Sequence, residues 1–190
     1  MAKQVEFFFD YGSPFSYLAD TQLPNLIKKT GAKIIYQPIL LGGIFKATGN
    51  SSPITIPAKG KYMGGDLARW AKHYGVVLEM NPFFPINTIR VMRGAIAAQN
   101  AGCFPAYHST MFRAMWAERV NLGDPAVVKP IFERLGMDPD SVERDDIKEK
   151  LKANTDDAVS RGAFGAPTFF VGDAMFWGND RMDFVEQALK

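Results

Sequence analysis

The feature that most constrains the fold is a short apolar run near the start of the chain that ends abruptly at a turn. Residues 5–9 read VEFFF and are followed by residues 10–12, whose Asp-Tyr-Gly sequence favours a turn. A bounded run of this length is typical of a buried central strand. Ser13 then suits the N-cap of a helix and Pro14 its first position, where the missing N–H costs nothing. The chain therefore begins with a strand that leads directly into a helix.

The middle of the chain predicts mostly helices. The first helix extends to Gly31, with a kink at Pro24, and residues 33–38 form a second strand rich in β-branched and aromatic side chains. Apolar side chains then recur at helical spacing, each stretch close to a capping glycine or proline. We predict further helices over residues 66–74, 88–101, 104–116, 125–135 and 145–160.

Strand-like spacing returns near the C-terminus. Residues 168–171 and 174–177 flank the pair Gly172-Asp173, which suits a tight hairpin turn. Asp180 can cap a last helix. The predicted order is therefore β-α-β, a helical block, and β-β-α.

The composition favours one domain and a small ligand. At 190 residues and 47% hydrophobic, the chain can bury one substantial core. Its 22 basic and 20 acidic side chains nearly cancel and form no basic run, so no nucleic-acid partner is expected. Because Asp10 directly follows the apolar residues 7–9, the N-terminus predicts neither a signal peptide nor a membrane span, and we expect a cytoplasmic protein.

Sulfur chemistry is limited by the single cysteine, Cys103, which cannot close an internal disulfide or run a dithiol cycle. Ser13 and Ser16 have the spacing of a C-x-x-C motif at a strand-to-helix junction, where free N–H groups favour an anion such as a thiolate. Ser13 could donate its hydroxyl hydrogen to such a sulfur. The alternative is that Ser13 only caps the helix, and the spacing alone favours that alternative.

Two further motifs lie near the C-terminus. A cis bond between Ala166 and Pro167 would turn the backbone groups of Ala166 toward an extended, peptide-like ligand, whereas an ordinary trans proline would only begin the strand. Residues 177–180 read WGND and could hold an amino group and a carboxylate, or simply cap the last helix. Neither motif predicts a metal site.

Taken together and in this order, the motifs resemble those of the 2-hydroxychromene-2-carboxylate isomerase family, which is related to kappa-class glutathione transferases and DsbA-type thiol oxidases. The resemblance lies in FFFDYGSPFSYLA at residues 7–19, LGGIFKATGN at 41–50, FGAPTFFV at 164–171 and FWGNDR at 176–181. It covers nearly the whole chain, although the helical middle matches only loosely. It implies an α/β thioredoxin fold interrupted by an all-helical insertion.

The resemblance also implies how the chain is divided. A single DsbA-like domain would cover residues 1–190, with thioredoxin-like parts at about 1–45 and 162–190 and the helical insertion at about 46–161. Glutathione would bind as the cofactor where these parts meet. Ser13 would be catalytic and contact the glutathione sulfur, and Ala166 with Pro167 would pair with the cysteinyl backbone. The γ-glutamyl end would contact Trp177, Gly178, Asn179 and Asp180.

The resemblance implies fewer residues for substrate binding than for glutathione binding. Lys46 and Asn50, in the loop after the second strand, would contact glutathione or an anionic substrate, or else be ordinary solvated loop residues. Phe84 and Asn87 are candidates for the aromatic end of the substrate, together with Phe83, although one phenylalanine is expected to pack in the core.

Other charged residues leave questions open. Arg90, Arg93 and Arg181 are candidates to neutralise a substrate carboxylate, and the sequence does not choose among them. His73 and His108 lie too far apart to predict a metal pair.

The activity that the resemblance implies is a glutathione-dependent cis-trans isomerisation of a small aromatic keto acid. The substrate would be 2-hydroxychromene-2-carboxylate and the product trans-o-hydroxybenzylidenepyruvate, interconverted by transient thiolate addition. Two alternatives stay open: a kappa-class-like glutathione transferase, and a non-catalytic module that binds peptides or thiols. A homodimer also stays open, because the oligomeric state is not readable from the sequence.

Overall fold

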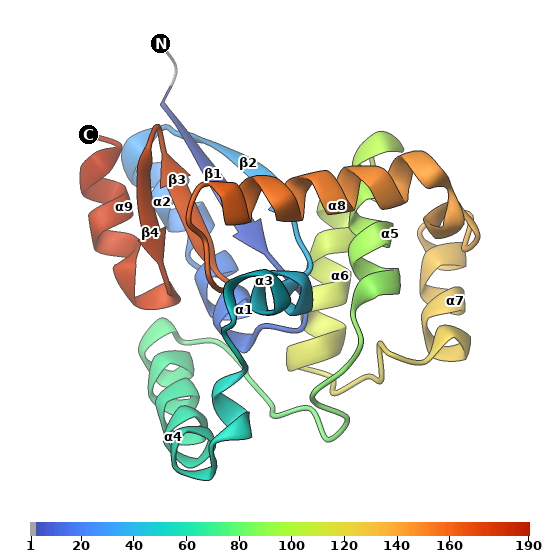
Figure 1. Ribbon diagram of the computed structural model, residues 1–190, viewed down its shortest axis with the longest axis horizontal. Helices are drawn as coiled ribbons and strands as arrows, with labels where there is room; N and C mark the ends of the chain where they lie inside the picture. The colour runs from blue at the N-terminus through green and yellow to red at the C-terminus, as the bar shows by residue number, and fades with distance from the viewer. Residues whose placement is uncertain (1–2) are drawn as a thin grey trace.

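The fold centres on a four-stranded sheet, which the computed structural model describes with its surrounding helices for residues 3–190 (Figure 1). The sheet has the spatial order β2-β1-β3-β4, in which β1 and β2 are parallel and β3 is antiparallel to both of its neighbours. All four strands occur where the sequence predicts them. Their bounds are β1 (Gln4–Phe9), β2 (Lys33–Pro38), β3 (Thr168–Val171) and β4 (Ala174–Trp177).

The prediction of one kinked first helix is wrong, because the chain forms two helices here. α1 (Pro14–Asp20) and α2 (Leu23–Thr30) are separated by residues 21–22. Pro24 is the second residue of α2 and has no N–H to continue a preceding helix, so a new helix begins there. The predicted end is confirmed, since Gly31 closes α2 with a left-handed φ of 68°.

Two helices were missed or shortened by the sequence prediction. α3 (Leu41–Thr48) occupies the predicted loop after β2, and α4 (Pro57–Tyr74) begins well before residue 66. Glycines 42 and 43 in α3 and glycines 60, 64 and 65 in α4 lower the intrinsic helix propensity. Tertiary packing overrides that weak preference.

The remaining helices agree with the predicted ranges to within one or two residues, except that a single 3-10 turn, Asn179–Arg181, precedes the last helix. The order β-α-β, helices, β-β-α confirms the predicted thioredoxin fold with inserted helices. No helix among residues 3–190 is long and apolar enough to cross a membrane. The other helices are α5 (Ile89–Asn100), α6 (Phe104–Trp116), α7 (Pro125–Arg134), α8 (Asp145–Ser160) and α9 (Met182–Ala188), with 3-10 turns at Pro53–Thr55 and Ser141–Glu143.

The main core surrounds the end of β1. Phe7 and Phe9 are fully buried in it, and their rings lie against Phe169 of β3 and Phe112 of α6, whereas Phe8 is buried on the other face of the sheet. One buried polar group belongs to this core: His108 bonds the hydroxyl of Tyr11 at 3.0 Å and the carboxylate of Asp20 at 2.9 Å. This close packing fixes the direction in which the chain leaves β1.

Helix α4 has a separate and smaller core. Leu18 of α1 packs with Met63, Leu67 and Ala71 of α4 to form this satellite cluster. Figure 1 shows α4 at one edge of the molecule, apart from α5 to α8. The sheet and α4 are therefore stabilised by different sets of apolar contacts.

Candidate active site

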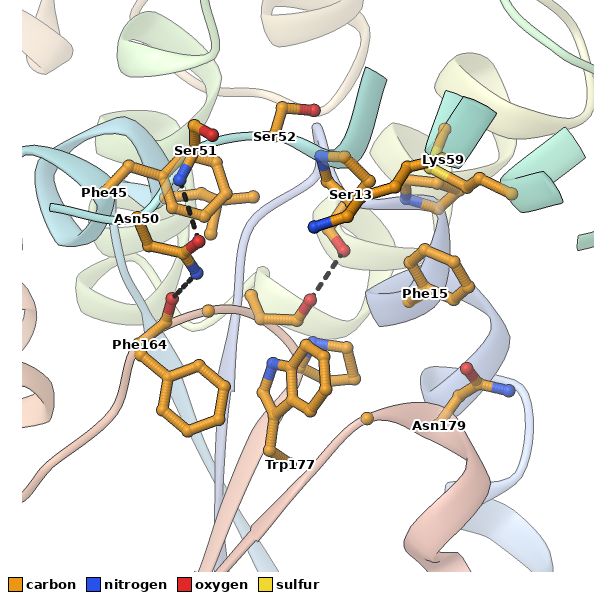
Figure 2. Close-up of a pocket in the computed structure, with 18 of the residues that line it drawn as sticks. Ser13, Phe15, Phe45, Asn50, Ser51, Ser52, Lys59, Phe164, Trp177 and Asn179 are labelled. Atoms are coloured by element: carbon orange, nitrogen blue, oxygen red, sulfur yellow. Dashed lines mark hydrogen bonds between the residues drawn. The ribbon is translucent and has the colours of Figure 1, made fainter. Parts of the chain in front are cut away.

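A cavity of about 1010 Å³ lies between α4 and the ends of the sheet strands. One side is formed by residues 12–15, which follow β1, and by two C-terminal segments, residues 164–167 and 177–180. The other side is formed by side chains of α3, of the loop after it and of α4. Segments from both ends of the chain therefore meet around one space (Figure 2).

Ser13 lies at the inner wall of this cavity and is 3% exposed. Its Oγ accepts the N–H of Ser16 at 3.1 Å, which is the N-cap contact expected at the start of α1. The same hydroxyl donates to the carbonyl oxygen of Ala166 at 3.0 Å, across the cavity floor (Figure 2). Ser13 therefore caps α1 and also faces the cavity, so the two sequence interpretations are compatible.

The bond between Ala166 and Pro167 is cis, as the sequence analysis required for a ligand-binding backbone. The carbonyl of Pro167 accepts the N–H of Gly178 at 3.0 Å, which ties the segment before β3 to the segment after β4. Trp177 packs on Phe164 with ring centroids 5.0 Å apart and remains 46% exposed at the cavity rim. These contacts make one continuous wall.

Residues 178–180 complete that wall. Gly178 has a φ of 98°, a value that favours glycine, and its N–H is already bonded. Asn179 is buried, its carbonyl accepts the hydroxyl of Tyr74 at 2.8 Å, and its Nδ2 has no hydrogen-bond partner among residues 3–190. Asp180 is exposed and pairs with Arg181. A smaller cavity of about 410 Å³ lies on the other side of Asn179 and Asp180.

Two of the predicted substrate residues line the cavity. Asn50 donates through Nδ2 to the carbonyl of Phe164 at 2.8 Å, and its Oδ1 accepts the N–H of Ser51 at 2.8 Å (Figure 2). Both ends of its amide group are therefore bonded within the cavity wall. Phe84 lines the cavity and also packs on Trp116, with ring centroids 5.6 Å apart. Phe83 is 53% exposed and does not pack in the core.

Lys46 and Asn87 lie outside the lining of this cavity. Lys46 is in the last turn of α3 and is exposed, whereas Phe45 and Thr48 of the same helix line the cavity. Asn87 uses its Oδ1 to accept the N–H of Ile89 at 3.0 Å, just before α5, so its side chain stabilises the start of a helix.

None of the three candidate arginines lines the cavity. Arg90 donates to the carbonyl of Pro139 at 2.8 Å, and Arg93 lies 3.3 Å from Glu143. Arg181 pairs with Asp180. All three guanidinium groups therefore already have partners within the protein.

The sequence analysis missed the contribution of α4. Lys59, Tyr62 and Met63 all line the cavity, and Figure 2 shows the side chain of Lys59 extending toward Ser13. Pro57, which suits a first helical position, could have revealed the true start of this helix. The one cysteine, Cys103, is half-buried at the start of α6, outside the lining.

The cavity thus offers polar groups on the Ser13 side, whereas the α4 side combines apolar groups with the cation of Lys59 and the carboxylate of Asp66. A long ligand with a peptide-like part and an apolar part matches this division. Chemistry at a sulfur atom requires a bound thiol, because the lining contains hydroxyl groups but no cysteine.

Comparison with known proteins agrees with this geometry. Residues 4–190 match the family model of the DSBA-like thioredoxin domain. The chain is 36% identical to 2-hydroxychromene-2-carboxylate isomerase of Sphingobium xenophagum, with 100% of this chain and 99% of that protein covered. It is 26% identical to human glutathione S-transferase kappa 1, with 100% and 92% covered. A solved structure of a 2-hydroxychromene-2-carboxylate isomerase matches with a TM-score of 0.87 at 33% identity, covering 98% of this chain and 94% of that one.

The fold and the domain match together define a protein of the DsbA-like thioredoxin class. Within that class, the chain belongs to the 2-hydroxychromene-2-carboxylate isomerase family. The resemblance found in the sequence is confirmed.

Proposed function

We propose that this protein is a glutathione-dependent isomerase that converts 2-hydroxychromene-2-carboxylate, or a close aromatic analogue, to trans-o-hydroxybenzylidenepyruvate. The observation that carries the proposal is the convergence of Ser13, the Ala166–Pro167 bond and residues 177–180 on one cavity of about 1010 Å³. Three relatives named 2-hydroxychromene-2-carboxylate isomerase are 34% to 36% identical to this chain, and the match covers 89% to 99% of their length. A cavity of that size accommodates a tripeptide and a small aromatic acid together, because drug-sized ligands typically occupy roughly 300 to 1,000 Å³.

The C-terminal wall fits the peptide part of glutathione. The unpartnered, buried Nδ2 of Asn179 is the kind of group that a ligand satisfies. Two glycines let this wall pack closely on itself: a Cβ on Gly165 would lie 2.7 Å from Nε1 of Trp177, and a Cβ on Gly178 would collide with the carboxylate of Asp180. The wall therefore presents polar groups to a γ-glutamyl end in a closely packed arrangement.

The two serines suit a mechanism in which the reacting sulfur belongs to a bound ligand and not to the protein. Ser13 and Ser16 stand at C-x-x-C spacing without a sulfur, and Cys103 is outside the cavity. When bound, glutathione supplies a thiolate, whose reversible addition to the conjugated double bond of the substrate permits rotation about that bond.

Ser13 stabilises the sulfur anion in this proposal. Its hydroxyl has one hydrogen, which is donated to the carbonyl of Ala166. Donation to a sulfur anion replaces that bond and leaves the Ala166 carbonyl free to accept an N–H of a bound peptide. Before binding, the Ser13 hydroxyl and the Ala166 carbonyl thus bond each other; after binding, both groups bond the ligand.

The α4 side of the cavity receives the substrate in this proposal. Phe45, Tyr62 and Phe84 present apolar surface to an aromatic ring. Lys59 supplies a positive charge for a carboxylate, of which both glutathione and the keto acid carry at least one. The cation and the rings hold the double bond of the substrate beside Ser13.

Product analysis tests the proposal. The protein is incubated with 2-hydroxychromene-2-carboxylate, with and without glutathione, and both products and thiol are followed by chromatography. The proposal expects the trans isomer to form only with glutathione, and the glutathione to be recovered unchanged. Isomer formation at an equal rate without glutathione would contradict it.

The same experiment separates the two alternatives. A transferase of the kappa type, favoured by the 26% identity to human glutathione S-transferase kappa 1, would consume glutathione and release a conjugate. A non-catalytic module would release neither product. Calorimetric titration with glutathione and with ordinary peptides then distinguishes that module, because only the enzyme requires the γ-glutamyl linkage.

A further inference from the structure

We propose that Asp10 is a positioning residue whose buried carboxylate holds the Gly12–Ser13 turn against the first turn of α3. The two segments are adjacent parts of the cavity wall, so one side chain sets their relative position. The predicted effect on turnover rests on the proposed function, whereas the predicted effect on structure does not.

The contacts of Asp10 divide between the two walls. The residue is 2% exposed, and its Oδ1 accepts the N–H of Gly12 at 2.9 Å. Its Oδ2 accepts the N–H of Leu41, the first residue of α3, also at 2.9 Å. In addition, the backbone carbonyl of Asp10 accepts the N–H of Ser13 at 3.0 Å. Each carboxylate oxygen therefore serves a different segment, and both segments contribute residues to the cavity.

Helix α3 depends on this carboxylate because it has no side-chain cap of its own. The N-cap residue is Leu40, whose apolar side chain cannot accept a hydrogen bond. The N–H of Leu40 is bonded instead to Oγ1 of Thr155 in α8 at 3.0 Å. Asp10 takes the next N–H, so the start of α3 is held by two residues from outside the helix.

The energetics indicate that Asp10 is not there simply for stability. None of the ion pairs among residues 3–190 includes it. Burial raises the pKa of its carboxyl group, although the N–H groups of Leu41 and Gly12 and the side chain of Thr88 act in the opposite direction. An unpaired buried carboxylate is costly, and such groups concentrate where function requires them.

Amide hydrogen exchange in the unliganded protein provides the first test. The variants are Asp10→Asn, which keeps the shape, and Asp10→Ala. The matched control is Thr155→Val. This variant removes the hydrogen bond to the N–H of Leu40, the residue just before α3, but keeps the γ-methyl group next to Gly43. Asp10→Ala removes both acceptor oxygens and should speed exchange at Gly12 and at Leu41 by about ten- to a hundredfold, since hydrogen bonds to charged groups are the strong ones. Asp10→Asn keeps one acceptor oxygen and should therefore speed exchange by that factor at only one of the two N–H groups. The control should speed exchange at Leu40 only.

Turnover provides the second test. Asp10→Asn should lower kcat by about tenfold while the KM for glutathione changes by less than about threefold, because the relative position of the walls matters most in the transition state. Thr155→Val should keep turnover within about twofold of the unaltered protein. If the unaltered protein shows no glutathione-dependent isomerisation, the proposed function fails, and the exchange data alone decide the role of Asp10.

Three results would overturn the inference. One is unchanged exchange at either Gly12 or Leu41 in Asp10→Ala. Another is a loss of turnover that only matches the loss of folded protein. The last is failure of both Asp10 variants to fold while Thr155→Val folds normally, which would assign Asp10 a general role in stability.

Discussion

The two sides of the cavity are built in different ways. The Ser13 side lies at the end of β1 and is joined by hydrogen bonds to residues near the C-terminus, where Ala166 is buried in a cluster with Phe8 and Phe170 of the sheet. The α4 side depends on the satellite cluster, in which Leu18 of α1 packs on buried residues of α4. The first side is therefore tied to the sheet, and the second is peripheral and largely apolar.

This difference suggests a division of labour. Groups that stabilise charge must be held within a fraction of an ångström, which the interlocked strand ends achieve. Groups that only accommodate a ring tolerate more movement. We therefore expect substitutions on the Ser13 side to change the chemical step, and substitutions on the α4 side to change substrate affinity.

The largest expected effect is that of Ser13→Ala. Without the hydroxyl, the pKa of the bound thiol should rise, because a charge-assisted hydrogen bond of about 1.5 to 3 kcal/mol is lost. At neutral pH the rate should fall by about ten- to a hundredfold, and part of the loss should return as the pH rises and the weaker acid ionises. Thiolate absorbance of the glutathione complex, followed against pH, measures the effect directly.

Ser16→Ala is the matched control for that variant. The Ser16 hydroxyl is fully buried and has no hydrogen-bond partner among residues 3–190, while the backbone N–H that it leaves untouched still bonds Ser13. Its removal should leave the titration curve where it was. Coincident curves for Ser13→Ala and the unaltered protein would reduce Ser13 to a helix cap.

Asp180→Ala should have the next largest effect, and on binding instead of rate. The carboxylate is remote from Ser13, so it should hold glutathione equally in the ground and transition states. We expect the KM for glutathione to rise about tenfold with little change in kcat. Asp183→Ala, an exposed neighbour outside the lining of the large cavity, is the control, and an equal KM shift in both variants would contradict the assignment.

Leu67→Ala tests the peripheral side. Leu67 is 2% exposed in the satellite cluster, and a Leu→Ala change in a core costs about 2 to 5 kcal/mol where the site cannot relax. Hydrogen exchange should quicken throughout α4, and the KM for the aromatic substrate should rise about threefold while the thiol titration is unchanged.

Leu23→Ala is the matched substitution in the main core, where the side chain is 1% exposed. It should lower the melting temperature without changing the substrate KM. If Leu67→Ala moved the thiol titration instead, the two sides would not be separable.

The smallest expected effect is that of Cys103→Ala. The thiol is half-buried outside the cavity, and in our proposal the reacting sulfur is that of glutathione. Turnover should stay within the error of a kinetic assay. Activity that needs no added glutathione and disappears with this substitution would refute the proposal.

Much of the fold was readable from the sequence because the decisive signals are local. The turn after β1, the cap at Ser13 and the hairpin around Gly172 each lie within a few residues. The local sequence left a cis and a trans bond open at Pro167, and the bond is cis. Short capped segments with clear periodicity were therefore predicted closely.

The errors arise where packing overrides local preference. In α3, Leu41, Ile44, Phe45 and Thr48 have helical spacing, yet two glycines hid the helix and put Lys46 in a supposed loop. Lys59 was missed because the start of α4 was placed too late. The capping of α3 by Asp10 was also invisible, since it joins residues that are 31 positions apart.

The bond between Ser13 and Ala166 joins residues 153 positions apart. Contacts of such long range form late, because the entropy of closing a large loop must be overcome first. During synthesis, the first helix leaves the ribosome long before β3 exists to pair with β1. A nascent or truncated chain without residues 164–180 lacks eight of the residues that line the cavity. The ability to bind a ligand in this cavity therefore requires that synthesis has passed residue 180.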